Sequence, residues 1–469
     1  MYAAYSARWS RRVELCNIAK VRMSSTLRIN GPARVNGEIT LPGDKSISHR
    51  AAMLASIAGG TSRITGFASS ADCQATLDCI QKLGIPVRQK EGEVTIEGRG
   101  LDGFNVSAQP VRLWAANSGS TIRMISGLLA GAPITSQIDG DSSLRRRPMR
   151  RIIEPLRQMG AQIEASKDNF PPLLISGRQL KPILYRSPIA SAQIKTCVLM
   201  AGLHARGKTT FVEPSPSRDH SEVMLPAFGV PVSVEPTTEG WKISIEGGHE
   251  LMPVSYHVPG DLSSAAFFIA AALLGQGSNV AIKGVGLNPT RSGFLDTLER
   301  LGAKISRSNL RHSAGEPIGD LAILASELSC AGGTCEISGP LIANLIDEIP
   351  IIAVIATQVI GRLEVRDARE LRIKESDRIN TVVGGIRAMG GTIEEFEDGF
   401  AIQGPQKLSG ARVQSHGDHR ISMAFSIAGL IANGVTEIED ADCAAVSLPE
   451  FHNLLSCLAG EGVVTVIKE

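Results

Sequence analysis

Two acidic segments in the second half of the chain place carboxylates where they could move protons. Asp347 stands just before the apolar run IIAVIA, at the entrance of a predicted buried element. A carboxylate there is costly unless it has partners, which is a typical setting for a catalytic acid or base. The segment LRIKESDR adds Glu375 between Lys374 and Arg378. If it is helical, the two cations share a face and Glu375 projects about 100° away, although a surface ion-pair cluster would show the same pattern.

A third segment, HGDHRISMAFSIA, brings His419 and Arg420 to the start of a predicted helix. Its H-x-x-H spacing could suit a pair of metal ligands. We expect no metal, because no third ligand cluster accompanies the histidines and the adjacent arginine would oppose a cation.

The first half of the chain offers cations and hydroxyl groups at predicted helix N-termini. LPGDKSISHR places Lys45, Ser46 and Arg50 before an apolar run, and NSGSTIR places Gly119 where a ligand could approach the backbone, with Arg123 one turn later. Helix N-termini attract anions, so these segments indicate phosphate or carboxylate sites. Ordinary capped helices with solvated cations remain the alternative.

Further cations fit the same interpretation less specifically. In SLRRRPMRRIIEPLR, Pro148 should start a helix with Arg147 at its beginning, leaving Arg150, Arg151 and Arg157 on outer faces. SAQIK supplies hydroxyl and amide donors at another helix start. SRDHSE and NPTR contribute Arg218, His220 and Arg291, for which a satisfied loop cation is the preferred interpretation. Together, these segments predict a cleft that binds small polyanions, with acid and base groups brought from one side.

One pattern recurs along the chain and must position these groups: an amphipathic helical stretch ends in glycine, and an alternating strand follows. Glycine suits the left-handed conformation that often ends a helix. Six such units, with glycines 69 to 88 residues apart, predict supersecondary modules grouped as three per domain. The glycines are Gly84, Gly160, Gly229, Gly302, Gly390 and, in the most degenerate unit, Gly462. HVPGD (257–261) is a natural crossing between halves, and a second crossing is expected near Pro42 and Gly43.

Composition excludes several classes of function. The 469 residues include 48 Lys and Arg against 47 Asp and Glu, so no overall field would hold nucleic acid or an anionic membrane. The longest apolar run has ten residues (265–274), too short to span a bilayer. Eight scattered cysteines without a CxxC pair indicate neither a disulfide framework nor a zinc ribbon, and suit a reducing cytosol.

The motifs GDK, SAQIK, RDHSE, NPTR, KESDR and DHR jointly resemble the 5-enolpyruvylshikimate-3-phosphate (EPSP) synthase family, in particular its second bacterial class, over about residues 27–469. The resemblance implies an α/β fold of two domains, each built of three βαβαββ units in an inverted α/β barrel. We expect an N-terminal extension at 1–26, one domain of 27–43 plus 257–469, and another of 44–256.

The resemblance also implies the reaction: the enolpyruvyl group of phosphoenolpyruvate passes to the 5-hydroxyl of shikimate 3-phosphate and phosphate is released, without metal or organic cofactor. Asp347 would accept the hydroxyl proton, Glu375 would shuttle a proton at the methylene carbon, and Lys45 would also be catalytic. Shikimate 3-phosphate would be held by Lys45, Ser46, Arg50, Ser191, Ala192, Gln193, Arg218, Asp347 and Lys374. Phosphoenolpyruvate would be held by Lys45, Gly119, Arg147, Gln193, Arg378 and Arg420, with Asn117, Arg123 and His419 in support.

Two positions depart from the family pattern. Many members carry lysine where this chain has Val446, so one cation of the enolpyruvate site is missing or supplied otherwise. Herbicide-tolerant relatives of the second class carry alanine where this chain has Gly119. We therefore expect glyphosate to inhibit this chain better than those relatives.

Two alternatives stay open at this stage. The sister transferase that acts on UDP-N-acetylglucosamine shares the fold and chemistry, but it carries Lys-Asn where this chain has Lys45-Ser46, and a loop cysteine that SLRRRP lacks. A non-catalytic polyanion-binding protein would not require Asp347 and Glu375 together. We expect a cytoplasmic monomer. A plastid location would follow only if the basic residues 1–22 are a transit peptide, and an upstream start codon before Met23 is the preferred interpretation of them.

Overall fold

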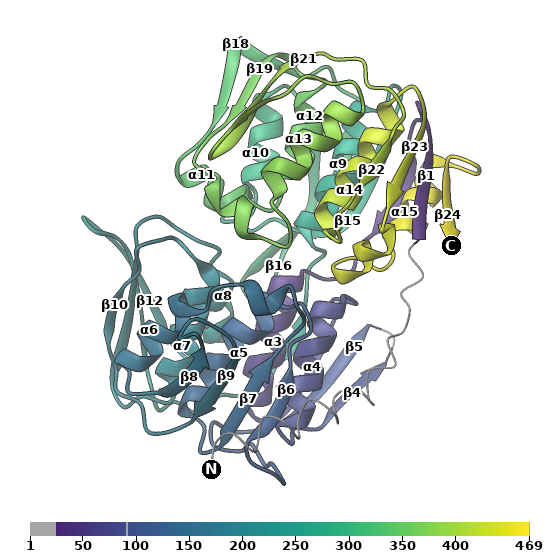
Figure 1. Ribbon diagram of the computed structural model, residues 1–469. Helices are drawn as coiled ribbons and strands as arrows, with labels where there is room; N and C mark the ends of the chain where they lie inside the picture. The colour runs from purple at the N-terminus through teal and green to yellow at the C-terminus, as the bar shows by residue number, and fades with distance from the viewer. Residues whose placement is uncertain (1–24, 91, 469) are drawn as a thin grey trace, which may run out of the picture.

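The computed structural model describes residues 25–90 and 92–468, and in these residues the chain forms two domains, one above the other in Figure 1. The described strands form six four-stranded sheets. The first domain holds, in spatial order, β14 (Ser255–His257), β3 (Gly59–Thr65), β5 (Glu93–Arg99) and β4 (Val87–Lys90); β6 (Val111–Trp114), β7 (Thr135–Asp139), β9 (Phe170–Ser176) and β8 (Gln162–Ser166); and β10 (Leu184–Arg186), β11 (Lys208–Glu213), β13 (Gly240–Glu246) and β12 (Val232–Thr237). The second domain holds β16 (Lys304–Ser313), β17 (Glu316–Leu324), β15 (Asn279–Gly286) and β2 (Asn36–Thr40); β18 (Ser329–Ile337), β19 (Ile360–Val365), β21 (Gly399–Gly404) and β20 (Glu394–Phe396); and β22 (Arg412–Gln414), β23 (Gly434–Glu439), β1 (Ser25–Gly31) and β24 (Val464–Lys468).

All six sheets have the same pairing pattern, which confirms the predicted six modules. In each sheet one edge strand pairs parallel with its neighbour, and the other two pairings are antiparallel. Strands β1 and β2, from the start of the described chain, complete sheets of the second domain. Figure 1 shows β1 in purple beside the yellow strands β23 and β24.

The glycines that mark the modules have positive φ angles of +77° to +97°. The first five each lie two residues beyond the end of a helix, as the left-handed termination requires. In the sixth unit the helix ends one residue before Gly460, which is its C-cap with φ +90°, so Gly462 lies in the following turn. This difference explains why the helix-glycine-strand pattern is the most degenerate in that unit.

Helices fill the space between the sheets of each domain. The first domain contains α3 (Lys45–Ser56), α4 (Ala71–Lys82), α5 (Gly119–Gly131), η1 (Leu144–Arg146), α6 (Arg150–Gln158), α7 (Ala192–Leu203) and α8 (His220–Ala227). The second contains α9 (Leu262–Leu274), α10 (Gly293–Arg300), α11 (Pro340–Leu345), α12 (Ile349–Ala356), η2 (Arg369–Ile373), α13 (Arg378–Ala388), α14 (His419–Ile431), η3 (Ala441–Val446) and α15 (Phe451–Ala459). Every residue of α12 is buried, as its apolar sequence IPIIAVIA predicts. Among the described residues, no helix is both long and apolar enough to cross a membrane.

The chain passes between the two hydrophobic cores twice. One core includes residues from Ile47 to Val258, and the other joins Leu27 to Leu41 with Leu262 to Leu458. Where the two connections meet, Asp44 N donates to Pro259 O at 2.7 Å and Asp261 N donates to Pro42 O at 3.1 Å. Residues 25 and 26, which we expected in the N-terminal extension, are the first two residues of β1, and the prediction for residues 1–22 lies outside the described residues.

Candidate active site

A cavity of about 350 Å³ lies between the two domains, and helix N-termini from both domains line it. The first domain contributes the starts of α3, α5 and α7, and the second contributes the residues at or just before the starts of α12, α13 and α14. Sixteen of the seventeen site residues predicted from the sequence line the cavity: Lys45, Ser46, Arg50, Gly119, Arg123, Arg147, Ser191, Ala192, Gln193, Arg218, Asp347, Lys374, Glu375, Arg378, His419 and Arg420. Asn117 lies behind them and accepts a hydrogen bond from Arg147 Nη2 at 2.6 Å.

Lys45 is the first residue of α3, and its ammonium is held toward the cavity. Asp44 caps the helix by accepting a hydrogen bond from Ile47 N at 2.9 Å. The Nζ of Lys45 donates to Asp72 Oδ2 at 2.9 Å. Burial would lower the pKa of Lys45, but the Asp72 carboxylate outweighs it and the pKa is raised. Lys45 is therefore a fixed positive charge at this side of the cavity.

Arg50 is buried, with an exposed fraction of 3%, so it is not the solvated cation of the alternative interpretation. It donates to the backbone oxygen of Ser46 at 2.8 Å and to Thr196 Oγ1 at 2.8 Å. Burial lowers its pKa to about 10. A guanidinium that faces mainly neutral acceptors at the edge of a cavity is suited to an anionic ligand.

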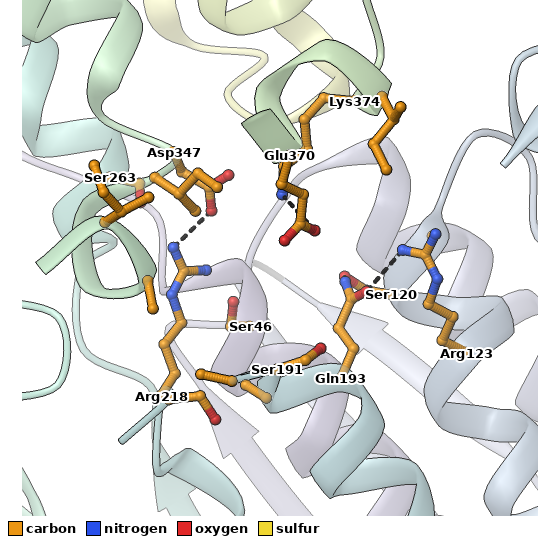
Figure 2. Close-up of a pocket in the computed structure, with 18 of the residues that line it drawn as sticks. Ser46, Ser120, Arg123, Ser191, Gln193, Arg218, Ser263, Asp347, Glu370 and Lys374 are labelled. Atoms are coloured by element: carbon orange, nitrogen blue, oxygen red, sulfur yellow. Dashed lines mark hydrogen bonds and ion pairs between the residues drawn. The ribbon is translucent and has the colours of Figure 1, made fainter. Parts of the chain in front are cut away.

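Three arginines stand close together on the α5 and α6 side of the cavity. Burial and the neighbouring Arg151 and Arg147 lower the pKa of Arg123 to about 9. Figure 2 shows Arg123 pointing toward Gln193, whose Oε1 accepts its hydrogen bond at 2.8 Å. A Cβ on Gly119 would lie 3.0 Å from Arg123 Nη1 and 3.3 Å from Arg147 Nη1. The positive charges of Arg123, Arg147 and Arg151 repel one another, and a bound phosphate or carboxylate would relieve this repulsion.

Asp347 reaches across the cavity to the first domain. Its Oδ2 accepts a hydrogen bond from Arg218 Nη2 at 2.6 Å, drawn as a dashed line in Figure 2. In the second domain, Arg378 and Arg420 lie 3.6 and 3.8 Å from its oxygens. Burial would raise the pKa of Asp347, but Arg420 and Arg218 outweigh it and hold the pKa well below its ordinary value. The carboxylate is therefore ionised and able to accept a proton.

Glu375 is also held by arginines of both domains. Its Oε2 accepts from Arg378 Nη2 at 2.7 Å, and its Oε1 accepts from Arg147 Nη1 at 3.2 Å. Burial would raise its pKa, but Arg378 and Arg147 lower it well below the ordinary value. Arg378 is fixed from behind by Asp418, the N-cap residue of α14, at 2.9 Å.

His419 and Arg420 begin α14 and are both buried. Burial and the nearby Lys45 ammonium lower the pKa of His419 to about 3, so its ring is neutral. Neither ring nitrogen has a hydrogen-bond partner within the described residues. Arg420 Nη1 donates to the backbone oxygen of Asp347 at 3.1 Å.

The structure corrects two expectations and agrees with a third. Arg151 does not lie on an outer face of α6: it lines the cavity and its Nη1 contacts Glu370 of the other domain at 3.3 Å. Lys374 and Arg378 do not share a helical face, because α13 begins only at Arg378, after the N-cap residue Asp377. Arg291 is a satisfied loop cation, as expected: it pairs with two carboxylates, and only 5% of it is exposed.

Some lining residues were not singled out from the sequence. Asp72 and Glu370 are the clearest, because each holds a cation of the cavity. Nothing in ADCQATL or in ARELRI distinguishes these carboxylates from surface charges. Their roles depend on which segments the fold brings together.

The sequence profile of the EPSP synthase (3-phosphoshikimate 1-carboxyvinyltransferase) family matches residues 29–455. The chain belongs to the EPSP synthase family. It is 50% identical over 432 residues to the 3-phosphoshikimate 1-carboxyvinyltransferase of Solibacter usitatus, covering 92% of this chain and 99% of that protein. It is 47% identical over 428 residues to the Bacillus subtilis enzyme of the same name, covering 91% and 97%. The solved structure of EPSP synthase from Acinetobacter baumannii matches with a TM-score of 0.83 at 40% identity, covering 95% of this chain and 100% of that one.

Each of the six EPSP synthase motifs in the sequence contributes to the cavity. GDK supplies Lys45, RDHSE supplies Arg218 and NPTR supplies Arg291, while SAQIK, KESDR and DHR supply two or three residues each. Val446, where many members carry lysine, lies in η3 and is not one of the residues that line the cavity.

Proposed function

We propose that this chain transfers the carboxyvinyl group of phosphoenolpyruvate to the 5-hydroxyl of shikimate 3-phosphate and releases phosphate, in the shikimate pathway of aromatic amino-acid biosynthesis. The observation that carries the proposal is the pairing of two ionised carboxylates, Asp347 and Glu375, with arginines of both domains around one cavity. Two phosphates and two carboxylates enter such a reaction, so a site for it needs an excess of cations together with an acid and a base.

Shikimate 3-phosphate occupies the side formed by α3, α7 and the segment before α8. Ser46, Ser191 and Arg218 are exposed to the same part of the cavity in Figure 2, which suits a phosphate. The residues we assign to this substrate are Lys45, Ser46, Arg50, Ser191, Ala192, Gln193, Arg218, Asp347 and Lys374. Asp347 and Lys374 bind its hydroxyl groups.

Phosphoenolpyruvate occupies the side where α5, α13 and α14 begin. The residues we assign to it are Lys45, Gly119, Arg147, Gln193, Arg378 and Arg420. Asn117, Arg123 and His419 support this site, and Asn117 does so by orienting the Arg147 guanidinium. The small Gly119 leaves room for the ligand against the two arginines beside it.

The reaction is an addition followed by an elimination. Asp347 accepts the 5-hydroxyl proton as that oxygen bonds to C2 of phosphoenolpyruvate, and the methylene carbon gains a proton from Glu375. Phosphate then leaves C2 and takes up one proton, which balances the proton that Asp347 accepted, and the new methyl group returns a proton to Glu375. Lys45 and the arginines offset the charge on the departing phosphate.

Glu375 must be protonated before it can donate, although arginines keep it ionised in the structure. The phosphate and carboxylate of the incoming substrate compete for Arg147 and Arg378. Their negative charge weakens the hold of these arginines on Glu375 and raises its pKa. Substrate binding thereby prepares the acid.

The proposal extends to the whole chain. We assign residues 44–256 to one domain and 27–43 with 257–469 to the other; β1 adds residues 25 and 26 to the second domain, and residues 257 and 258 pack with the first. Closure between the domains excludes water from the reaction. We also propose that the protein acts as a cytoplasmic monomer.

Phosphate release by the purified protein tests the proposal. Phosphoenolpyruvate is supplied with either shikimate 3-phosphate or UDP-N-acetylglucosamine, without added metal. We expect release that depends on shikimate 3-phosphate. Release only with the nucleotide sugar would place the activity in the sister family, and release with neither acceptor would leave a polyanion-binding protein.

A further inference from the structure

A four-residue turn of the second domain, Asn288 to Arg291, contacts the N-termini of two helices in the first domain. It lies between β15 and α10 and has the sequence NPTR. The assigned chemistry makes no use of this turn. Both of its polar ends are buried, with 3% of Asn288 and 5% of Arg291 exposed.

Arg291 joins the two connections between the domains. Its Nη2 lies 3.2 Å from Asp44 Oδ2 and 3.1 Å from Asp261 Oδ1. Asp44 is the N-cap residue of α3, whose first residue is Lys45, and Asp261 is the N-cap residue of α9. One guanidinium thus holds the start of a substrate-binding helix in one domain against a buried helix of the other.

The same guanidinium reaches the neighbourhood of Asp347 through one intermediate. Arg291 Nη2 donates to Ser263 Oγ at 2.7 Å, and the Ser263 hydroxyl donates in turn to Glu348 Oε1. Glu348 follows Asp347 directly and is the N-cap residue of α12. Figure 2 shows Ser263 beside Asp347. Arg291 is therefore linked to Asp44 and Glu348, the residues next to Lys45 and Asp347 in the chain.

Asn288 makes the corresponding contact at α8. Its Nδ2 donates to Asp219 Oδ1 at 2.7 Å and to Glu316 Oε2 at 2.9 Å. Asp219 is the N-cap residue of α8 and follows Arg218, the residue that binds Asp347 across the cavity. Thr290 Oγ1 donates to the same Asp219 oxygen at 3.1 Å.

We propose that the turn 288–291 is a positioning element for the reaction, with Arg291 at its centre, which fixes Lys45 and Arg218 of the first domain relative to Asp347 of the second. Arg291 is a positioning residue, because its Nη2 contacts Asp44, Asp261 and Ser263. The inference rests on the proposed function for its kinetic consequences, and on the domain arrangement alone for its structural ones.

The test must separate positioning from simple charge balance. Arg291→Met leaves two buried carboxylates without their cation and should lower the thermal unfolding midpoint. The triple variant Asp44→Asn, Asp261→Asn, Arg291→Met removes that imbalance, and asparagine caps a helix as well as aspartate does. We expect the triple variant to regain the unfolding midpoint of the wild type to within a few degrees.

We expect kcat of the triple variant to stay at least tenfold below that of the wild type, with each KM changed less than threefold. Binding groups within each domain keep their contacts, whereas the distance from Lys45 to Asp347 loses its constraint. Arg307→Met is the matched control, because Arg307 also bridges two carboxylates, Asp296 and Glu299, but on the surface of the second domain. It should leave kcat unchanged.

A triple variant with wild-type kcat would overturn the inference, as would one that fails to fold or a control with an equal loss of kcat. Small-angle X-ray scattering gives a readout that does not need activity: the ligand-free triple variant should show a larger radius of gyration than the wild type. An unchanged radius would contradict the inference. Absence of activity in the wild type would instead contradict the proposed function.

Discussion

Two carboxylates of the cavity pair with arginines across the two domains. Asp347 holds Arg218 across the gap at 2.6 Å, and Glu375 holds Arg147 at 3.2 Å. Under the proposed function, these carboxylates occupy places that the substrates' anionic groups would take. Binding then exchanges ion-pair partners, which limits the desolvation cost and changes the pKa of each carboxylate as the site fills.

Gly119→Ala tests how closely a ligand approaches the start of α5. The new methyl group would lie 3.0 Å from Arg123 Nη1 and 3.3 Å from Arg147 Nη1, so these arginines must shift by a few tenths of an ångström. We expect the KM for phosphoenolpyruvate to rise about tenfold and the inhibition constant of glyphosate to rise by more than tenfold. Small displacements of positioning groups are costly, which is the reason for both effects. Steady-state kinetics measure both.

Gly384→Ala is the control, since Gly384 lies in α13 and a Cβ there meets nothing within 4 Å. It should leave both constants unchanged. Undiminished inhibition of Gly119→Ala by glyphosate would show that Arg123 and Arg147 do not limit the room for a ligand beside residue 119.

The sequence indicated cavity residues that lie in a local motif and missed those defined by contact between domains. Lys45 and Gly119 could be found because a helix N-terminus is visible in the sequence. Arg151 could not be placed, since its direction depends on Glu370, which is more than 200 residues away in the chain. Arg291 looked like an ordinary loop cation because its partners lie at the two domain connections.

The fold repeats one module, a helix, its terminating glycine and a hairpin, six times. The helix, its terminating glycine and the following hairpin could all be predicted, because each depends on residues close together in the sequence. The resemblance placed residues 27–43 in the second domain, but the strands with which β1 and β14 pair could not be predicted, since pairing partners of isolated strands carry no local signal. The modules present their helix N-termini to one cavity, which explains how anion sites accumulate there.

Equivalent glycines in two modules provide a matched stability test. Gly84 and Gly160 have φ angles of +85° and +95°. A Cβ on Gly160 meets nothing within 4 Å, whereas one on Gly84 would lie 2.0 Å from the backbone oxygen of Asn105. We expect Gly160→Ala to lower the free energy of unfolding by about 1–2 kcal/mol, the cost of a left-handed conformation for alanine.

Gly84→Ala should cost at least twice as much, because backbone atoms must also move. Urea-induced unfolding measures both variants. Equal losses would show that the loop containing Asn105 adapts freely, which would contradict the tight packing of this module.

Several buried histidines make the free energy of unfolding of the protein depend on pH. His204 ends α7 within the first domain, away from the residues that line the cavity, and burial lowers its pKa to about 4. In the unfolded chain a histidine has a pKa of about 6.5. The unfolded state therefore binds the proton first, so the stability from this group is present above pH 6.5 and is lost as the pH falls toward 4.

His204→Gln should remove this contribution. We expect the slope of the free energy of unfolding against pH to flatten by about 1.4 kcal/mol per pH unit between about pH 4 and 6, the value for one proton. Urea titrations at several pH values measure the slope, with the exposed His312→Gln as control. An unaltered slope would show that His204 gains its proton without unfolding.

Under the proposed function, the two domains together assemble an acid and a base around two anionic substrates. Phosphate release by Asp347→Asn, with saturating phosphoenolpyruvate and shikimate 3-phosphate, tests this assembly. We predict a rate about 10²- to 10⁴-fold below that of the wild type, the usual contribution of a general base. The surface variant Asp296→Asn should retain the wild-type rate. Release by Asp347→Asn within a few-fold of the wild-type rate would contradict the role of Asp347 as the general base.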